Sequence, residues 1–74
     1  MPVGGLTADQ NRRLVAQFSA RLIERYGARA LDEAHSVITM LQELGRDELI
    51  PLWRSTAAEI ARRLKRRQAR SKAA

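Results

Sequence analysis

Apolar residues recur at helical spacing in three successive segments of this chain, and a glycine follows each of the first two. The segments cover residues 7–26, 29–44 and 48–64. Their apolar side chains return every three or four residues, which places them on one face of an α-helix. The members of the three stripes are Leu14, Val15, Phe18, Leu22 and Tyr26; Ala30, Leu31, Ala34, Val37, Ile38, Leu41 and Leu44; and Leu49, Trp53, Thr56, Ala57, Ile60 and Leu64. The pattern predicts three amphipathic helices.

Polar residues and glycines mark the ends of the first two helices. Thr7 and Gln10 have the spacing of a capping box, in which each side chain bonds the backbone N–H of the other residue. Gly27 and Gly45 follow the first and second stripes, where a glycine typically ends a helix. These signals predict a helix start at Thr7 and stops at both glycines.

The sequence is compatible with two different first residues for the third helix. Asp47 is a suitable N-cap residue, which would begin the helix near residue 48. If Pro51 instead occupies the first helical position, the helix begins nearer Ile50 and residues 46–49 form a separate turn. The sequence does not decide between them.

The chain has 74 residues and no cysteine, which allows one domain without disulfide support. No segment shows the alternation of a strand. Three helices of similar length with short links predict an all-α, up-down-up three-helix bundle over residues 7–64. Residues 1–6 are expected to be flexible, and residues 65–74 to form either a projecting helix end or a disordered tail. A chain this short buries only about 60% of its unfolded surface, which leaves oligomerisation open.

Charge is distributed unevenly along the chain. The formal net charge is +6, and residues 62–74 hold seven Lys and Arg and no acid. Residues 1–61 hold seven Arg and eight Asp and Glu, so the predicted helical body has a net charge of −1. In an up-down-up bundle the end of the first helix and the start of the second would lie beside the base of this basic extension. The sequence therefore predicts a nearly neutral body with one cationic pole.

Side chains for catalysis or metal binding are not arranged in any recognisable pattern. The single histidine, His35, lies at the edge of the second stripe, with no partner at a suggestive spacing to orient it as a general base. No His or Cys pair, calcium loop or glycine-rich phosphate motif occurs. We therefore expect a non-enzymatic protein with no cofactor, metal or small-molecule substrate. The absence of a secretory signal or a long apolar run predicts a cytoplasmic protein without a transmembrane segment.

The basic residues carry the leading functional hypothesis. Arginine and lysine side chains contact phosphates and release counterions, which favours binding to a nucleic-acid backbone without sequence preference. No aromatic residue lies among residues 62–74, so base stacking is not indicated. The predicted contacts are Arg62, Arg63, Lys65, Arg66, Arg67 and Arg70, supported by Arg21, Arg25 and Arg29.

Two alternatives use other surfaces. A protein-protein adaptor or a homodimer would use apolar residues outside the tightest arcs together with an aromatic, namely Ile23, Met40, Ile50 and Trp53. A helix-turn-helix-like DNA binder would use Gly45 and residues 46–48 as its turn, although apolar residues occupy the start of the third helix where base contacts are made.

A further pattern links the second and third helices. Tyr26, Gly27, Ala30, Ala34, Gly45, Trp53 and Ile60 together resemble short helical bacterial proteins in which a Gly-Asp link precedes a helix with a single tryptophan. In this chain Arg46 separates Gly45 from Asp47. The resemblance covers roughly residues 23–64. It implies the helical bundle and no particular activity, because the family it points to has no assigned activity.

Overall fold

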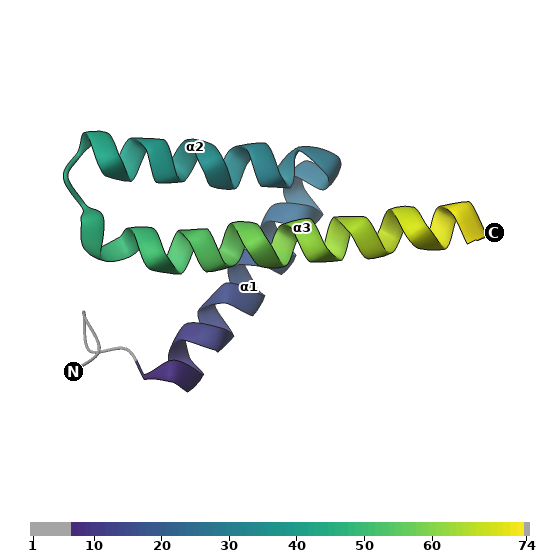
Figure 1. The fold of residues 1–74 in the computed structure, drawn as a ribbon, viewed down its shortest axis with the longest axis horizontal. Coiled ribbons are helices and arrows are strands. Elements are labelled where there is room, and N and C mark those ends of the chain that lie inside the picture. The colour runs from purple at the N-terminus through teal and green to yellow at the C-terminus, as the bar shows by residue number, and fades with distance from the viewer. Residues whose placement is uncertain (1–6, 74) are drawn as a thin grey trace.

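The computed structural model describes residues 7–73, the last four of them by their backbone alone. Its elements follow in the order α1 (Ala8–Tyr26), η2 (Gly27–Arg29), α2 (Ala30–Glu43), η3 (Asp47–Leu49) and α3 (Ile50–Ala73), where η marks a 3-10 turn. No strand occurs between residues 7 and 73, so the all-α prediction is confirmed (Figure 1). Residues 1–6, predicted as a flexible segment, lie outside the described part of the chain.

The start and end of α1 follow the local signals in the sequence. The backbone N–H of Gln10 donates to Thr7 Oγ1 at 3.1 Å, and the backbone N–H of Thr7 donates to Gln10 Oε1 at 3.0 Å. These reciprocal bonds satisfy donors that the first turn of a helix leaves free. Gly27 ends α1 with φ at 58°, in the left-handed region that glycine adopts without steric cost. The capping box and the first glycine stop are thus confirmed.

The link between α2 and α3 is a glycine cap followed by one 3-10 turn. Gly45 has φ at 72°, and its N–H donates to the carbonyl of Gln42 at 3.2 Å. The N–H of Arg46 donates to the carbonyl of Leu41 at 2.8 Å, which completes a Schellman motif. The predicted glycine stop is confirmed.

The start of α3 at Ile50 resolves the two starts that the sequence left open. Pro51 lies in the first turn of α3, and η3 forms the separate turn before it. The predicted start near residue 48, with Asp47 as the N-cap, is not confirmed. The carbonyl of an N-cap residue accepts the first helical hydrogen bond from the N–H four residues later, and Pro51 has no N–H.

The core lies where α2 and α3 run side by side in opposite directions (Figure 1). Its buried members are Ala30 and Ala34 of α2 and Ala57 and Ile60 of α3. The small alanine side chains allow α2 and α3 to approach closely, and larger side chains cover the edges of this contact. The partly buried residues packed against it are Leu22, Ile23, Leu31, Ile38, Trp53 and Leu64.

Helix α1 crosses α3 obliquely and does not lie along the hairpin of α2 and α3 (Figure 1). At the crossing Ser19 and Thr56 are fully buried, and Ser19 Oγ donates to the carbonyl of Thr56 at 3.4 Å. Phe18 stacks on Trp53 beside it, with ring centroids 5.3 Å apart. Small side chains at one point of contact allow two helices to approach closely while their axes are inclined to each other. The predicted up-down-up bundle of aligned helices is therefore not confirmed.

Helix α3 continues far beyond the last residue of its apolar stripe. The predicted helix ended at Leu64, whereas α3 extends to Ala73. At 1.5 Å per residue, the nine residues after Leu64 add about 13 Å of helix. Figure 1 shows this end of α3 extending past both of the other helices. Of the two conformations left open for the basic extension, the structure has the projecting helix.

Candidate polyanion-binding helix

The projecting part of α3, residues 65–73, is here called the cationic arm. It contains Lys65, Arg66, Arg67, Arg70 and Lys72 and no acidic residue. The side chains of Lys65, Arg66 and Arg67 are exposed and form no ion pair with any side chain that the structure describes. The side chain of Arg70 lies outside what the structure describes. The arm thus presents uncompensated positive charge on a regular helix.

Repulsion between these charges does not prevent helix formation. Arg66 and Arg70 of the arm are four residues apart in the sequence, and a like-charge pair at this spacing destabilises a helix by about 0.2–0.5 kcal/mol. Three effects oppose the repulsion. The costly first turn of α3 is already formed by the packed half, arginine, lysine and alanine are good helix formers, and cations are favourable near a helix C-terminus.

Arg62 and Arg63 differ from the arm because they are paired. Both bond the carboxylate of Glu59, with Arg62 Nη2 at 2.7 Å from Oε1 and Arg63 Nε at 2.8 Å from Oε2. Hydrogen bonding from Arg62 and, to a smaller extent, from Arg63 lowers the pKa of the Glu59 carboxyl below its usual range. The Glu59 side chain is 19% exposed and that of Arg62 is 65% exposed, so Arg62 still faces solvent. These two predicted contacts are therefore partly neutralised, and the spacing of Glu59 three and four residues before them is the sequence signal for it.

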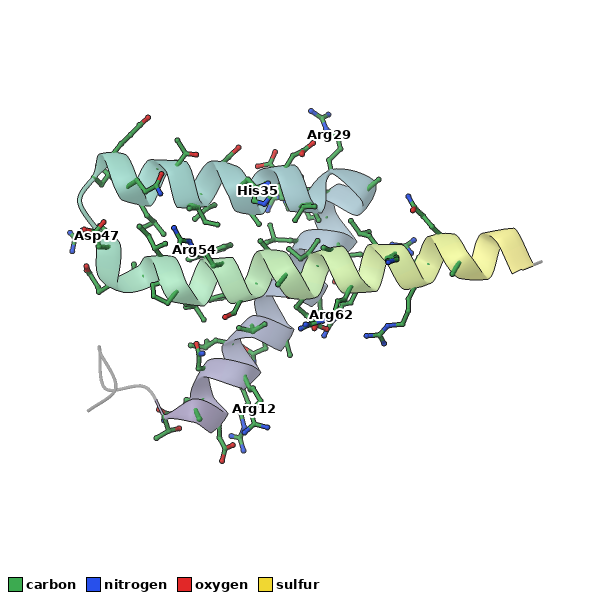
Figure 2. All side chains as sticks on the ribbon, viewed as in Figure 1. Arg12, Arg29, His35, Asp47, Arg54 and Arg62 are labelled. Carbon is green, nitrogen blue, oxygen red and sulfur yellow. The ribbon has the colours of Figure 1, made fainter. Side chains whose placement is uncertain are left out.

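The three supporting arginines differ in what the structure shows of them. The end of α1 and the start of α2 do meet near the base of the arm, since Leu22, Ala30 and Leu64 belong to the same packed region. Arg29, however, points away from α3 (Figure 2). Arg25 lies over the ring of Tyr26, with its guanidinium carbon 5.8 Å from the ring centroid. Arg21 is exposed on α1.

The four residues predicted for an apolar interface differ in their exposure. Ile50 is 8% exposed and therefore belongs to the buried surface. Ile23 and Trp53 are partly buried against the core. Met40 alone of the four is strongly exposed, at 56%. Packing against the other helices buries a wider arc of α3 than its apolar stripe predicted, and Ile50 lies within that wider arc.

Three of the exposed large apolar side chains belong to the end of the α2–α3 hairpin opposite the arm, namely Met40, Leu44 and Leu49, whereas Tyr26, which is also exposed, ends α1. Leu44 lies one helical turn after Met40 on α2, and Leu49 follows in η3, which contacts α2. The exposure of Leu44 and Leu49 is not evident from sequence, because both continue predicted apolar stripes.

A shallow groove of about 460 Å³ runs along the seam between α2 and α3. Its floor is apolar, and His35 and Arg54 stand on the two facing helices (Figure 2). No sequence pattern predicts this groove, because it depends on which edges of the two helices are brought together. Its lining residues are Leu31, His35, Ile38, Arg54, Ala57, Ala58 and Ala61.

The geometry of α2 and α3 gives no support to a helix-turn-helix. That motif joins its helices at about 90–120°, whereas α2 and α3 are antiparallel neighbours (Figure 1). Its recognition helix reads bases through its N-terminal residues. Ile50 and Leu52, at the start of α3, are buried.

Among the described residues, no helix is both long enough and apolar enough to cross a membrane. No group of three or more His, Asp or Glu side chains within the same part of the chain is placed to hold a metal ion. Comparison with known protein families, curated proteins and solved structures gave no match to this chain.

Proposed function

We propose that this protein is a non-enzymatic binding module whose cationic arm docks on the phosphate backbone of a nucleic acid. The supporting observation is the exposure of Lys65, Arg66 and Arg67 on a helix that extends beyond the body of the protein, with no acidic residue after Glu59. Phosphates attract such side chains whatever the base sequence, and each neutralised phosphate releases condensed counterions. Phosphate contacts set position on a nucleic acid but do not specify sequence.

The test is a titration of fluorescently labelled DNA and RNA at several salt concentrations. The intact chain is compared with a triple variant of the arm, Lys65→Gln, Arg66→Gln and Arg67→Gln. The slope of log K against log salt should fall by about 2.7 in the variant, because each phosphate contact contributes about 0.9 on duplex DNA.

A matched variant separates the arm from net charge alone. Arg12, Arg13 and Arg46 are exposed arginines outside α3, and Figure 2 shows Arg12 on the part of α1 remote from the arm. Changing all three to Gln removes the same charge. We expect this control to retain most of the affinity. Equal losses in the two triple variants would show that net charge alone causes binding, and the absence of any salt-dependent binding would overturn the proposal.

A second candidate function rests on the apolar residues at the opposite end of the molecule. Met40, Leu44 and Leu49 are 56%, 66% and 40% exposed. Exposed apolar side chains that lie together often mark a protein-protein contact. Sedimentation across a range of concentrations tests the homodimer form of this candidate. A Met40→Gln, Leu44→Gln variant should then shift the protein toward the monomer, and a strict monomer at every concentration would exclude that form.

A further inference from the structure

We infer that the cationic arm recognises duplex DNA of B form by lying in its major groove. This inference rests on the proposed function and names the class of nucleic acid and the groove.

Positive charge covers more than half of the circumference of the arm. Lys65, Arg66 and Arg67 are consecutive residues of α3. Because each residue of an α-helix turns by about 100°, these three side chains leave the helix over an arc of about 200°. A flat anionic surface can contact one face of a helix only. An arc this wide suits a partner with anionic walls on both sides of the helix.

The major groove of B-form DNA has that shape. It is about 12 Å wide and admits an α-helix, and an α-helix with its side chains is about 10–12 Å across. Phosphates line both edges of the groove. The arm is about 13 Å long, and at about 3.4 Å per base pair it would span about four base pairs.

Other polyanions match the arm less well. Double-stranded RNA has a deep and narrow major groove that side chains do not reach. Single strands are bound largely by aromatic stacking, and no aromatic residue follows Trp53 in the sequence. A membrane-surface helix needs an apolar face, and the apolar stripe of α3 ends at Leu64. B-form duplex DNA is the partner that the arm favours.

The inference is tested with four labelled probes of the same length. They are a DNA duplex, the same duplex with a glucosylated hydroxymethyl group at C5 of its cytosines, an RNA duplex and single-stranded DNA. The C5 substituent fills the major groove and leaves the phosphates unchanged, since the C5 position faces that groove. We expect the plain duplex to bind about tenfold more tightly than each of the other probes.

Failure of the inference and failure of the proposed function give different results. If all four probes bind with similar, salt-dependent affinity, the arm contacts phosphates from outside the groove. The inference is then overturned and the proposed function stands. If no probe binds, both are overturned.

A pair of variants tests whether the helical form of the arm matters. Gln68 is an exposed residue of the arm, and Gln68→Pro interrupts the helix without changing its charge. Gln68→Ala is the matched control that keeps the helix. We expect Gln68→Pro to lose the preference for the plain duplex and Gln68→Ala to retain it, with circular dichroism reporting the helix content of both. Retention of the preference by Gln68→Pro would overturn the inference.

Discussion

The two halves of α3 differ in what surrounds them. From Ile50 to Leu64 the helix packs against α1 and α2, and Ile60 has no exposed surface. From residue 65 onward no apolar side chain larger than alanine occurs, and Lys65, Arg66 and Arg67 are exposed. Tertiary contacts stabilise the first half of α3, whereas the second half is stabilised only by the backbone hydrogen bonds that continue the helix. One helix can therefore serve as the centre of a small core and as a projecting binding element, and the two roles should respond to different substitutions.

Substitution in the packed half should cause the largest change in stability. Ile60→Ala removes a fully buried side chain from the contact between α2 and α3, and such a change typically costs about 2–5 kcal/mol. The whole protein is expected to have about 4–11 kcal/mol of stability, at about 0.05–0.15 kcal/mol per residue. Urea unfolding should therefore show a large fall in midpoint.

The affinity of the Ile60 variants for DNA tests whether the two halves of α3 are independent. Under conditions in which the Ile60→Ala variant is still folded, its affinity for DNA should match that of the intact chain, because the arm is unchanged. Ile60→Val is the conservative control, since it should lower the free energy of unfolding by only about 0.5–1.5 kcal/mol. A loss of affinity in the folded Ile60→Val variant would show that the two halves of α3 are not independent.

Glu59 stands at the boundary between the halves and should have an intermediate effect. Its carboxylate accepts hydrogen bonds from Arg62 and Arg63. Ion pairs at these spacings on a helix contribute about 0.3–0.5 kcal/mol each, so Glu59→Gln should cost up to about 1 kcal/mol at neutral pH. The same change frees two arginines for phosphate contacts and should increase the affinity for DNA.

The pH dependence gives an independent check on Glu59. Because its pKa is lowered in the folded protein, the carboxylate contributes stability above its ordinary pKa and loses that contribution as pH falls through the folded-state value. The difference in unfolding free energy between the intact chain and Glu59→Gln should therefore be full at neutral pH and disappear in strong acid. A difference that does not change with pH would contradict the pairing with Arg62 and Arg63.

Local sequence signals predicted most of the secondary structure. The capping box at Thr7 and the stops at Gly27 and Gly45 each depend on a few neighbouring residues, so their geometry follows from the sequence alone. The arrangement of the helices was not predictable in this way. The oblique course of α1 depends on Ser19 meeting Thr56 across 37 positions of the chain, and no helical stripe carries that information.

The candidate site was predictable as a set of charges but not as a shape. Composition identified Lys65, Arg66 and Arg67, and all three are exposed. Their conformation depended on a balance between charge repulsion and continuation of a helix already formed, and this balance amounts to only a few tenths of a kcal/mol per residue. The orientation of Arg29 away from α3 depended on how α2 meets α3, which the stripes do not determine (Figure 2).

Substitution in the arm should cause the smallest change in stability and a clear change in binding. Arg67→Ala relieves a like-charge pair with Arg63 at four residues' spacing, which favours the variant by about 0.2–0.5 kcal/mol. It also removes a cation from the C-terminal half of α3, where the helix dipole favours positive charge, although that effect fades beyond the last turn. The two contributions oppose each other, so unfolding free energy should change by less than about 0.5 kcal/mol. The salt slope for duplex DNA should nevertheless fall by about 0.9, the value of one phosphate contact. A fall in stability comparable to that of Ile60→Ala would mean that the arm packs against the body, and the distinction between the two halves of α3 would then be wrong.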